Sequence, residues 1–420
     1  MNFFRLLRQT FSRWAPALDS RVWILAAGRL LSQIGIGFTL FYAPIFFVDK
    51  VGLSPTEVGI GIGSGSISGI LGRFFGGSFS DSLAWGRRRT LLLSAAISAL
   101  ADLVLVVTTD FSTFVAGNLL MGLGIGLYWP ATEAVVADIT TDDQRSEAYA
   151  IVRLADTMGL GVGVVLGGGL IALTGAYRAL FVVDGITYLF FFAIVYWAIA
   201  ETLRTDRSES HFFAGWGAAL RDTSLMIYAS VNIFMTGYIS QIQSTLPVYL
   251  NQFVKLGETG KGFSAALLSL FFTGHIALAA VCQLPVARTL KGGSLLRALM
   301  LSAILWGIGF TLIWFTGAAA MGQVIWAGLA LGVMAIAMAV YTPVASSLVV
   351  KLAPQSLRGV YLSVNSMCWA IGYLIGPPVG GWALDHSGGF ADRFWLVSAL
   401  SVVGVIGVLQ YLDRRLTQEP

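Results

Sequence analysis

The sequence predicts an all-α membrane protein with twelve transmembrane helices arranged as two pseudo-symmetric six-helix bundles. Three observations lead to this prediction: the composition, the number of long apolar stretches and an internal repeat. Of the 420 residues, 56% are hydrophobic and only 11% are charged, whereas a typical globular chain has about 25% charged residues. So few charges cannot cover a water-soluble body of this size, and most of the surface must face hydrocarbon. The composition therefore excludes soluble enzymes and nucleic-acid-binding proteins.

Apolar stretches of about 20 residues, the length that crosses a bilayer, occur twelve times. They lie near residues 22–48, 57–80, 90–109, 111–137, 146–173, 177–200, 222–250, 262–287, 294–316, 319–350, 357–384 and 391–412. The longest polar break separates six stretches from six. We therefore expect bundles at 22–200 and 222–412 with a linker at 201–221, preceded by an amphipathic segment at 1–21 and followed by a tail at 413–420.

The distribution of basic residues predicts the orientation. An even number of spans places both termini on one side of the membrane. If that side is the cytoplasm, 18 of the 26 Lys and Arg residues fall inside and five fall outside, as the positive-inside rule requires. Residues 1–20 lack the apolar core of a signal peptide. We expect a multi-pass protein of an inner membrane with both termini in the cytoplasm.

An internal repeat supports the division into two bundles. A shift of 213 residues aligns the fourth and fifth helices with the tenth and eleventh. The identical pairs are Met121/Met334, Tyr128/Tyr341, Pro130/Pro343, Arg145/Arg358, Gly159/Gly372, Gly163/Gly376, Gly167/Gly380 and Gly168/Gly381. Because six helices separate the copies, both halves start with the same topology, which is the parallel-repeat arrangement of two-bundle transporters.

Several chemistries have no motif in this chain. No G-x-x-x-x-G-K-[ST] phosphate-binding loop occurs, so ATP hydrolysis is not the expected energy source. The three histidines, His211, His275 and His386, are too dispersed for a metal site, and Cys282 and Cys368 lie inside apolar runs. We expect no catalytic residues, no metal and no cofactor.

The loop between the second and third helices carries a family resemblance. It reads Gly-Ser-Phe-Ser-Asp-Ser-Leu-Ala-Trp-Gly-Arg-Arg-Arg over residues 77–89 and resembles the G-x-x-x-D-R-x-G-R-R signature of the major facilitator superfamily. Ser82 stands where that pattern has Arg, and two extra residues precede the second glycine. The resemblance implies the superfamily fold and a conformational latch between the bundles, formed by Gly77, Asp81, Gly86, Arg87, Arg88 and Asp138. The alternative is that the arginines only anchor the loop to the membrane surface.

Glycine-rich stretches extend the resemblance to the drug:proton antiporters of this superfamily. Helix five carries glycines at the antiporter spacing, with Val164 in place of the proline, and helix eleven carries the full G-P-x-x-G-G form. Small residues every four positions allow close helix packing. We interpret Gly159, Gly163, Gly167, Gly376, Pro377 and Gly380 as an inter-bundle motif. Asn118 occupies the position of an arginine that these antiporters have in helix four.

Charged residues inside the predicted helices are the candidates for proton coupling, because each costs at least about 2.5 to 3.5 kcal/mol at mid-bilayer. The candidates are Glu133, Asp156, Arg153 and Asp102. At the 213-residue offset the first three correspond to uncharged residues, so the fold itself does not require them. Arg153 and Asp156 are three residues apart and could neutralise one another. Glu133 could bind a proton or a cation, or pair with Arg29 or Arg153. Arg29 and Arg73 lie nearer the cytoplasmic face, where their side chains could extend to the surface.

The resemblance also implies a central cavity lined mainly by helices one, four, seven and ten. Its expected substrate-binding residues are Gln33, Tyr42, Asn118, Trp129, Glu133, Asn232, Gln241, Met338, Tyr341, Asn365 and Trp369. Aromatic rings, methionine and a few amides suit a small amphipathic organic molecule. The alternative is that many of these aromatic rings pack against lipid or neighbouring helices.

These observations predict a non-enzymatic secondary active transporter that works by alternating access, as a monomer, with a small-molecule substrate, protons and the lipid bilayer as its partners. Proton-coupled efflux of amphipathic compounds follows from the antiporter resemblance. Two alternatives remain open: import of a metabolite such as a sugar or organic acid, and a non-transporting assembly or pigment-handling role on the same scaffold.

Overall fold

The computed structural model is helical along the chain and describes residues 18–82, 85–202, 216–256, 262–289, 293–354, 358–386 and 389–418. Within these ranges, the side chains at 81, 142–147, 150, 284, 287, 288, 358 and 359 lie outside the description. Residues 1–17 of the predicted amphipathic segment at 1–21 lie outside the described residues.

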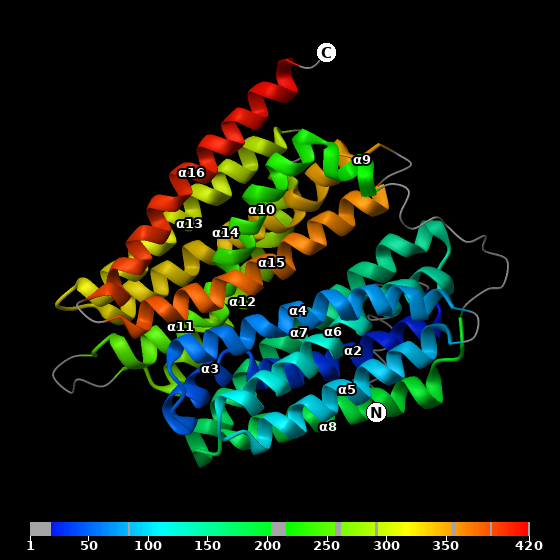
Figure 1. Ribbon diagram of the computed structural model, residues 1–420, viewed down its shortest axis with the longest axis horizontal. Helices are drawn as coiled ribbons and strands as arrows, with labels where there is room; N and C mark the ends of the chain where they lie inside the picture. The colour runs from blue at the N-terminus through cyan, green and yellow to red at the C-terminus, as the bar shows by residue number, and fades with distance from the viewer. Residues whose placement is uncertain are drawn as a thin grey trace, which may run out of the picture.

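The first half of the chain forms one bundle, which occupies the lower half of Figure 1. Its elements are α2 (Ser20–Thr39), α3 (Ala43–Phe46), the π-helical turn η1 (Phe47–Val51), α4 (Pro55–Asp81), α5 (Gly86–Val107), α6 (Phe111–Ile139), α7 (Asp142–Thr174) and α8 (Arg178–Ala198). Within it, α2 packs on α7 and α8, while α6 packs on α4 and α5.

The second half forms a bundle with the same order of elements. After the short α9 (Trp216–Arg221) come α10 (Thr223–Gln243), α11 (Thr245–Val248), η2 (Tyr249–Phe253), α12 (Ala265–Thr289), α13 (Leu295–Ala318), α14 (Gln323–Leu352), α15 (Arg358–Asp385) and α16 (Phe390–Gln418). In both halves a proline, Pro44 or Pro247, lies in a four-residue helix that interrupts the first span and is followed by a π turn. Proline cannot donate a backbone hydrogen bond, which favours such an interruption.

Glycines bring the first and fifth helices of each bundle together. Gly163 on α7 leaves no room for a Cβ against the Ile34 carbonyl and Gly37 of α2. In the second bundle, Gly376 on α15 lies in the same way against Gly237 and Ser240 of α10. This corrects the inter-bundle interpretation of Gly159, Gly163, Gly167, Gly376 and Gly380, because their nearest neighbours lie on α2, α10 or α11 within the same bundle. Repeated glycine spacing identifies a close helix contact but not the partner helix.

The two bundles meet through α4 with α15 and through α7 with α12. We call the end of the bundles that carries α9 the linker end, and the opposite end the far end. At the far end, Gly59 of α4 packs on Pro377 and Pro378 of α15, and the Thr56 amide donates to Asp385 Oδ2 at 2.7 Å. Pro377 is therefore the member of the predicted glycine motif that does lie between the bundles.

A second group of far-end contacts joins the interrupted first span to α12. The rings of Phe41 and Phe272 stack with their centroids 4.2 Å apart, and the Ser269 hydroxyl donates to the Val164 carbonyl of α7 at 3.2 Å. From this closed end the bundles diverge toward the end that carries α9 (Figure 1). The structure is thus packed at the far end and splayed at the linker end.

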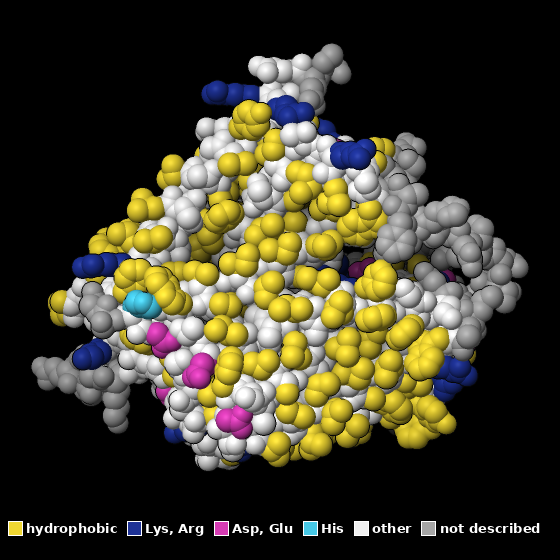
Figure 2. Space-filling model, viewed as in Figure 1, with side chains coloured by type: hydrophobic (Ala, Val, Ile, Leu, Met, Phe, Trp, Pro, Cys, Tyr) yellow, Lys and Arg dark blue, Asp and Glu magenta, His cyan; other side chains and the backbone are white. Residues whose placement is uncertain are grey.

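The outer surface is apolar. Large side chains such as Leu103, Leu270, Val281 and Val403 are more than half exposed, and Figure 2 shows hydrophobic side chains across much of one face of both bundles. Within the described ranges, eleven helices are long and apolar enough to cross a membrane, and α15 lies at the position of the remaining predicted span. The chain is a multi-pass membrane protein, for which twelve spans and the orientation stay predictions.

Candidate functional site

A buried ion pair joins α2 to α7. Arg29 Nε donates to Asp156 Oδ1 at 2.8 Å, and Arg29 Nη2 forms a second bond to Oδ2. The Arg29 side chain is 3% exposed and that of Asp156 is 17% exposed. Arg29 lies about 14 Å from the start of α2 at 1.5 Å per residue. Such a bidentate pair compensates a charge that would otherwise be costly at this depth.

Two aromatic rings from α6 complete the surroundings of Arg29. Its guanidinium carbon lies 5.0 Å from the centroid of Trp129 and 5.3 Å from that of Tyr128. Both distances fall in the range of favourable cation–π contacts. Trp129, which the sequence predicts to bind substrate, therefore packs against the buried ion pair and is itself half-buried.

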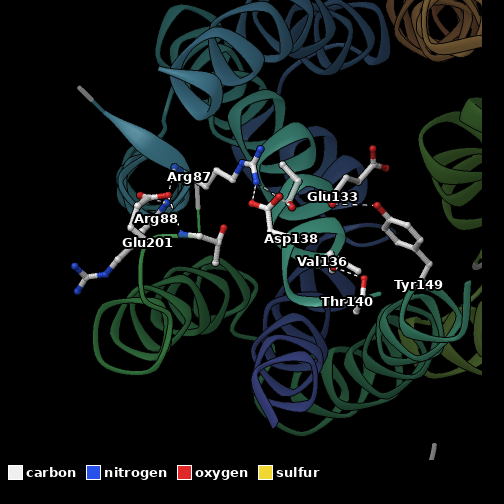
Figure 3. A network of polar contacts seen from close by, with 10 residues as sticks. Arg87, Arg88, Glu133, Val136, Asp138, Thr140, Tyr149 and Glu201 are labelled. Carbon is white, nitrogen blue, oxygen red and sulfur yellow. Dashed lines mark hydrogen bonds and ion pairs between the residues drawn. The ribbon is translucent and has the colours of Figure 1, made fainter. Parts of the chain in front are cut away.

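Glu133 lies one turn after Trp129 on α6 and is exposed. Tyr149 of α7 donates its hydroxyl to the backbone carbonyl of Glu133 at 3.0 Å, and the carboxylate extends away from this bond and from Asp138 (Figure 3). Its charge acts on both Arg29 and Arg73. Two arginines, Asp156 and an ionised Glu133 together carry no net charge, whereas protonation of Glu133 leaves one positive charge.

Arg73 connects this group of charges to the other bundle. Its Nη1 donates to the carbonyl of Ser366 on α15 at 3.0 Å and to the Ser366 hydroxyl at 2.6 Å. Arg73 lies in the second half of α4, closer to the linker end than the glycine contacts with Pro377 and Pro378. A charged residue thus bridges the bundles just where they begin to diverge.

Arg153 does not pair with Asp156, although the three-residue spacing on α7 would allow it. Asp156, three residues later, pairs with Arg29 instead, and Arg153 is exposed. The predicted neutralisation of Arg153 by Asp156 is therefore wrong. The physical reason is that Arg29 is buried beside Asp156 and needs a counter-charge, whereas the exposed Arg153 does not.

The loop residues of the proposed latch lie at the linker end of α5 and α6. Arg87 forms an ion pair with Asp138 and donates from Nη1 to the Ala134 carbonyl at 3.4 Å. The backbone amides of Arg87 and Arg88 donate to Glu201 at 3.0 and 3.2 Å, as Figure 3 shows. Ala134 and Asp138 belong to α6 of the first bundle, and Glu201 follows α8. The Asp81 side chain lies outside the described residues.

Two glycines frame this loop. Gly86 has φ +83° and faces Glu201, whose carboxylate occupies the space that a Cβ would need. The left-handed φ and the close carboxylate explain why glycine stands there. Gly77 has no heavy atom near its missing Cβ. Glu201, which the sequence analysis placed only in the linker, is therefore a structural partner of the loop.

The predicted substrate-binding residues divide into three groups, of which the first is Glu133 alone, because it is exposed. Half-buried members that keep some exposure are Gln33, Asn118, Trp129, Met338, Asn365 and Trp369. Buried members are Tyr42, Asn232, Gln241 and Tyr341. In this conformation the polar atoms of these four side chains bond to other helices, and their role in lining a substrate cavity stays a prediction.

The buried members have specific partners. Tyr341 donates its hydroxyl to Asn232 Oδ1 at 2.5 Å, and Asn232 Nδ2 donates to Asn365 Oδ1 at 2.9 Å. Gln241 donates to the Gly376 carbonyl at 2.7 Å, and Tyr42 donates to the Val164 carbonyl at 2.9 Å. Buried polar groups need such partners, so these side chains join helices.

Asp102 lies apart from the other proton-coupling candidates. It is buried on α5. Its neighbouring charge is Asp184 on α8, and it is not part of the Arg29–Asp156 pair. Arg29 and Arg73, in contrast, are central residues that sequence reasoning assigned to the membrane surface. The signal for them was an arginine inside an apolar helix.

Comparison with known proteins decides the family. The family model described as Major Facilitator Superfamily matches residues 25–291 and 258–420. The chain belongs to the Major Facilitator Superfamily. It is a secondary transporter of that superfamily, which confirms the resemblance seen in the loop and in the repeat.

Curated relatives of the same superfamily cover almost the whole chain. The MFS-type transporter YttB of Bacillus subtilis is 25% identical over 94% of this chain and 95% of its own length. The Na(+), Li(+), K(+)/H(+) antiporter of Planococcus maritimus is 23% identical, with 93% and 94% covered. The multidrug resistance protein MdtH of Aeromonas salmonicida is 24% identical, with 93% of each chain covered.

Solved structures of superfamily transporters share the fold. The nucleoside transporter NupG superimposes with a TM-score of 0.79 over 94% of this chain and 99% of NupG, at 13% identity. Identity this low supports the fold alone.

Proposed function

We propose that this transporter exports small amphipathic organic compounds in exchange for protons, with Glu133 as the group that binds the proton. The observation that carries the proposal is the position of Glu133, an exposed carboxylate whose charge acts on Arg29 and on Arg73. The names of two relatives, a multidrug resistance protein and a cation/proton antiporter, support the substrate class and the coupling ion.

In the proposed cycle, the charge of Glu133 controls the Arg73 bridge. When Glu133 is ionised, it attracts Arg73 toward α6 and weakens the bond to Ser366. When Glu133 is protonated, Arg73 keeps Ser366 and the bundles stay joined at this point. Proton binding thereby shifts the balance between two arrangements of the bundles.

The side chains around Glu133 suit the proposed substrate. Trp129 lies one turn before Glu133 on α6, and Met338 and Trp369 of the second bundle are also partly exposed, so all three can offer apolar or aromatic surface to a substrate. An amphipathic cation would gain from these rings and from an ionised Glu133. Proton-coupled import of a metabolite and a non-transporting assembly role remain the alternatives. An importer would carry the proton in the same direction as its substrate, and an assembly protein would carry neither.

Orientation and assembly are part of the same proposal. The basic residues Arg87, Arg88 and Arg221 lie at the linker end, which suits the cytoplasmic side of an inner membrane. The far-end closure would then make this an inward-open arrangement. The proposed carrier acts as a monomer and binds no nucleic acid.

The test is proton-driven uptake of a panel of amphipathic cations into everted vesicles. Wild-type protein should accumulate substrate when a pH gradient is imposed. Glu133→Gln should abolish accumulation while substrate-for-substrate exchange continues, because the glutamine cannot release a proton. Asp110→Asn, an exposed residue that caps α6, is the matched control and should behave as wild type. Full proton-driven accumulation by Glu133→Gln would contradict the proposal.

A further inference from the structure

Two buried carboxyl groups form a pair inside the first bundle. Asp102 on α5 and Asp184 on α8 are each 1% exposed. Each lies about 8 Å from the far end of its helix at 1.5 Å per residue, so the two are at the same depth. The Asp102 side chain lies against Gly185, where a Cβ would be 3.3 Å from that of Asp102. Their charges act on one another.

Most oxygen atoms of this pair have no hydrogen-bond partner. Both carboxyl oxygens of Asp102 and Oδ1 of Asp184 are buried without one. Asp184 Oδ2 accepts from the Thr39 hydroxyl of α2 at 3.2 Å. Native structures satisfy nearly all buried polar atoms, so these oxygens require an occupant.

The groups around the pair supply no counter-charge. From α8, Tyr188 contacts Met121 of α6 through its hydroxyl at 3.8 Å, and Arg178 donates to the carbonyls of Val106 and Thr108. On α2, Arg29 is bound to Asp156. Among the described residues, no Lys, Arg or His forms an ion pair with Asp102 or Asp184. Two carboxylates in a low-dielectric interior cannot both stay charged without a bound cation.

We propose that Asp102 and Asp184 form a binding site for one monovalent cation, a proton or an alkali-metal ion, separate from the Arg29–Asp156 pair. The available ligands are carboxyl and hydroxyl oxygens, which suit hard cations and offer nothing to soft metals. The site goes beyond the proposed function, because it lies outside the residues to which proton-coupled export is assigned.

The site is placed to influence the contact between the bundles. Thr39 is the last residue of α2, where the first span is interrupted before α3, and interrupted helices commonly contribute to cation sites in transporters. Two residues later, Phe41 stacks on Phe272 of the other bundle. A cation held by Asp184 and Thr39 therefore steadies the segment that carries this contact.

The test uses thermal unfolding of the purified full-length protein in choline, sodium, lithium or potassium chloride at equal ionic strength, at pH 6 and pH 9. If an alkali-metal ion binds, one of these salts raises Tm saturably at pH 9, less so at pH 6, where protons compete. If only a proton binds, the salts have equal effects and Tm falls from pH 6 to pH 9, because the bound proton is lost as pH rises.

Asparagine variants of Asp102 and Asp184 test whether the response of Tm to salt or to pH comes from these two residues. Asp102→Asn and Asp184→Asn should remove the response, and Asp110→Asn should keep it. Responses equal to wild type in both asparagine variants would overturn the proposal, as would a wild type that responds to neither salt nor pH.

A second measurement covers the case in which the asparagine variants do not fold. Infrared difference spectra of a Glu133→Gln protein should show a carboxylic-acid band that disappears as pH rises or as the alkali-metal salt is added. Absence of the band at pH 6, together with no salt effect, would also overturn the proposal. Neither experiment measures transport, so its failure is distinguishable from failure of the proposed export function.

Discussion

Arg29 on α2 and Asp156 on α7 are 127 residues apart in the chain, yet they form a bidentate ion pair that joins the first and fifth helices of one bundle. Glycines pack α2 against α7 on the same side. The close backbone approach brings the two side chains within bonding distance, and the rings of Tyr128 and Trp129 shield them from solvent. The pair is therefore a structural clamp between α2 and α7.

We expect Asp156→Asn to destabilise the protein by about 3 kcal/mol, because it leaves a buried guanidinium without a counter-charge. This value is at the lower end of the usual range since Asp156 retains 17% exposure. Thermal unfolding in detergent measures the loss. Arg153→Met on the same helix is the control and should change Tm little. Joint replacement of Arg29 by Met and Asp156 by Leu should recover much of the loss, and failure to recover any would contradict this account.

The Arg73 bridge predicts a coupling between two helices of different bundles. Ser366→Ala should weaken the linker-side contact by about 1.5 to 3 kcal/mol, the usual contribution of a hydrogen bond to a charged group, although the carbonyl bond of Arg73 remains. Spin labels on α4 and α15 would report a larger population of separated bundles. Ser347→Ala on α14, whose hydroxyl donates to the Pro343 carbonyl of its own helix, is the control. An unchanged distance distribution in Ser366→Ala would show that Arg73 does not hold the bundles.

Gly163 provides a test of the close packing between α2 and α7. Gly163→Ala should cost about 1 to 3 kcal/mol, because its Cβ would collide with the Ile34 carbonyl and with Gly37. Gly169→Ala, six residues along α7, meets nothing within 4 Å and should be neutral or slightly stabilising. Unfolding temperatures of the two variants decide the question, and equal stability would refute the contact.

The division of the predicted substrate-binding residues is testable by kinetics. Tyr341→Phe removes the hydroxyl group that donates a hydrogen bond to Asn232 Oδ1. It should lower the free energy of unfolding by about 1 to 3 kcal/mol, with little change in the KM for transport. Met338→Ala, at a half-buried position, should raise KM about tenfold by removing apolar contact. A rise in KM for Tyr341→Phe with unchanged stability would restore that tyrosine as a substrate-binding residue.

Sequence reasoning located the charged residues inside the helices but did not pair them correctly. Glu133 and Asp156 were recognised because the other half of the repeat lacks them. The error came from assigning Arg29 to the surface by its distance along the helix, which does not tell whether a side chain faces lipid or a neighbouring helix. Likewise, the glycine spacing of α7 predicted a close contact, and its partner α2 became evident only in the structure.

The sequence by itself determined that this chain spans a membrane many times, that its two halves are related by an internal repeat and that ionisable groups are concentrated in the first half. These properties depend on hydropathy, periodicity and repetition, which are local or additive along the chain. Only the tertiary structure decided that Arg29 holds Asp156, that Arg73 crosses to Ser366 and that Asn232 and Tyr341 are buried together. Helix rotation and the choice of neighbours depend on packing between segments more than a hundred residues apart, which no single helix encodes.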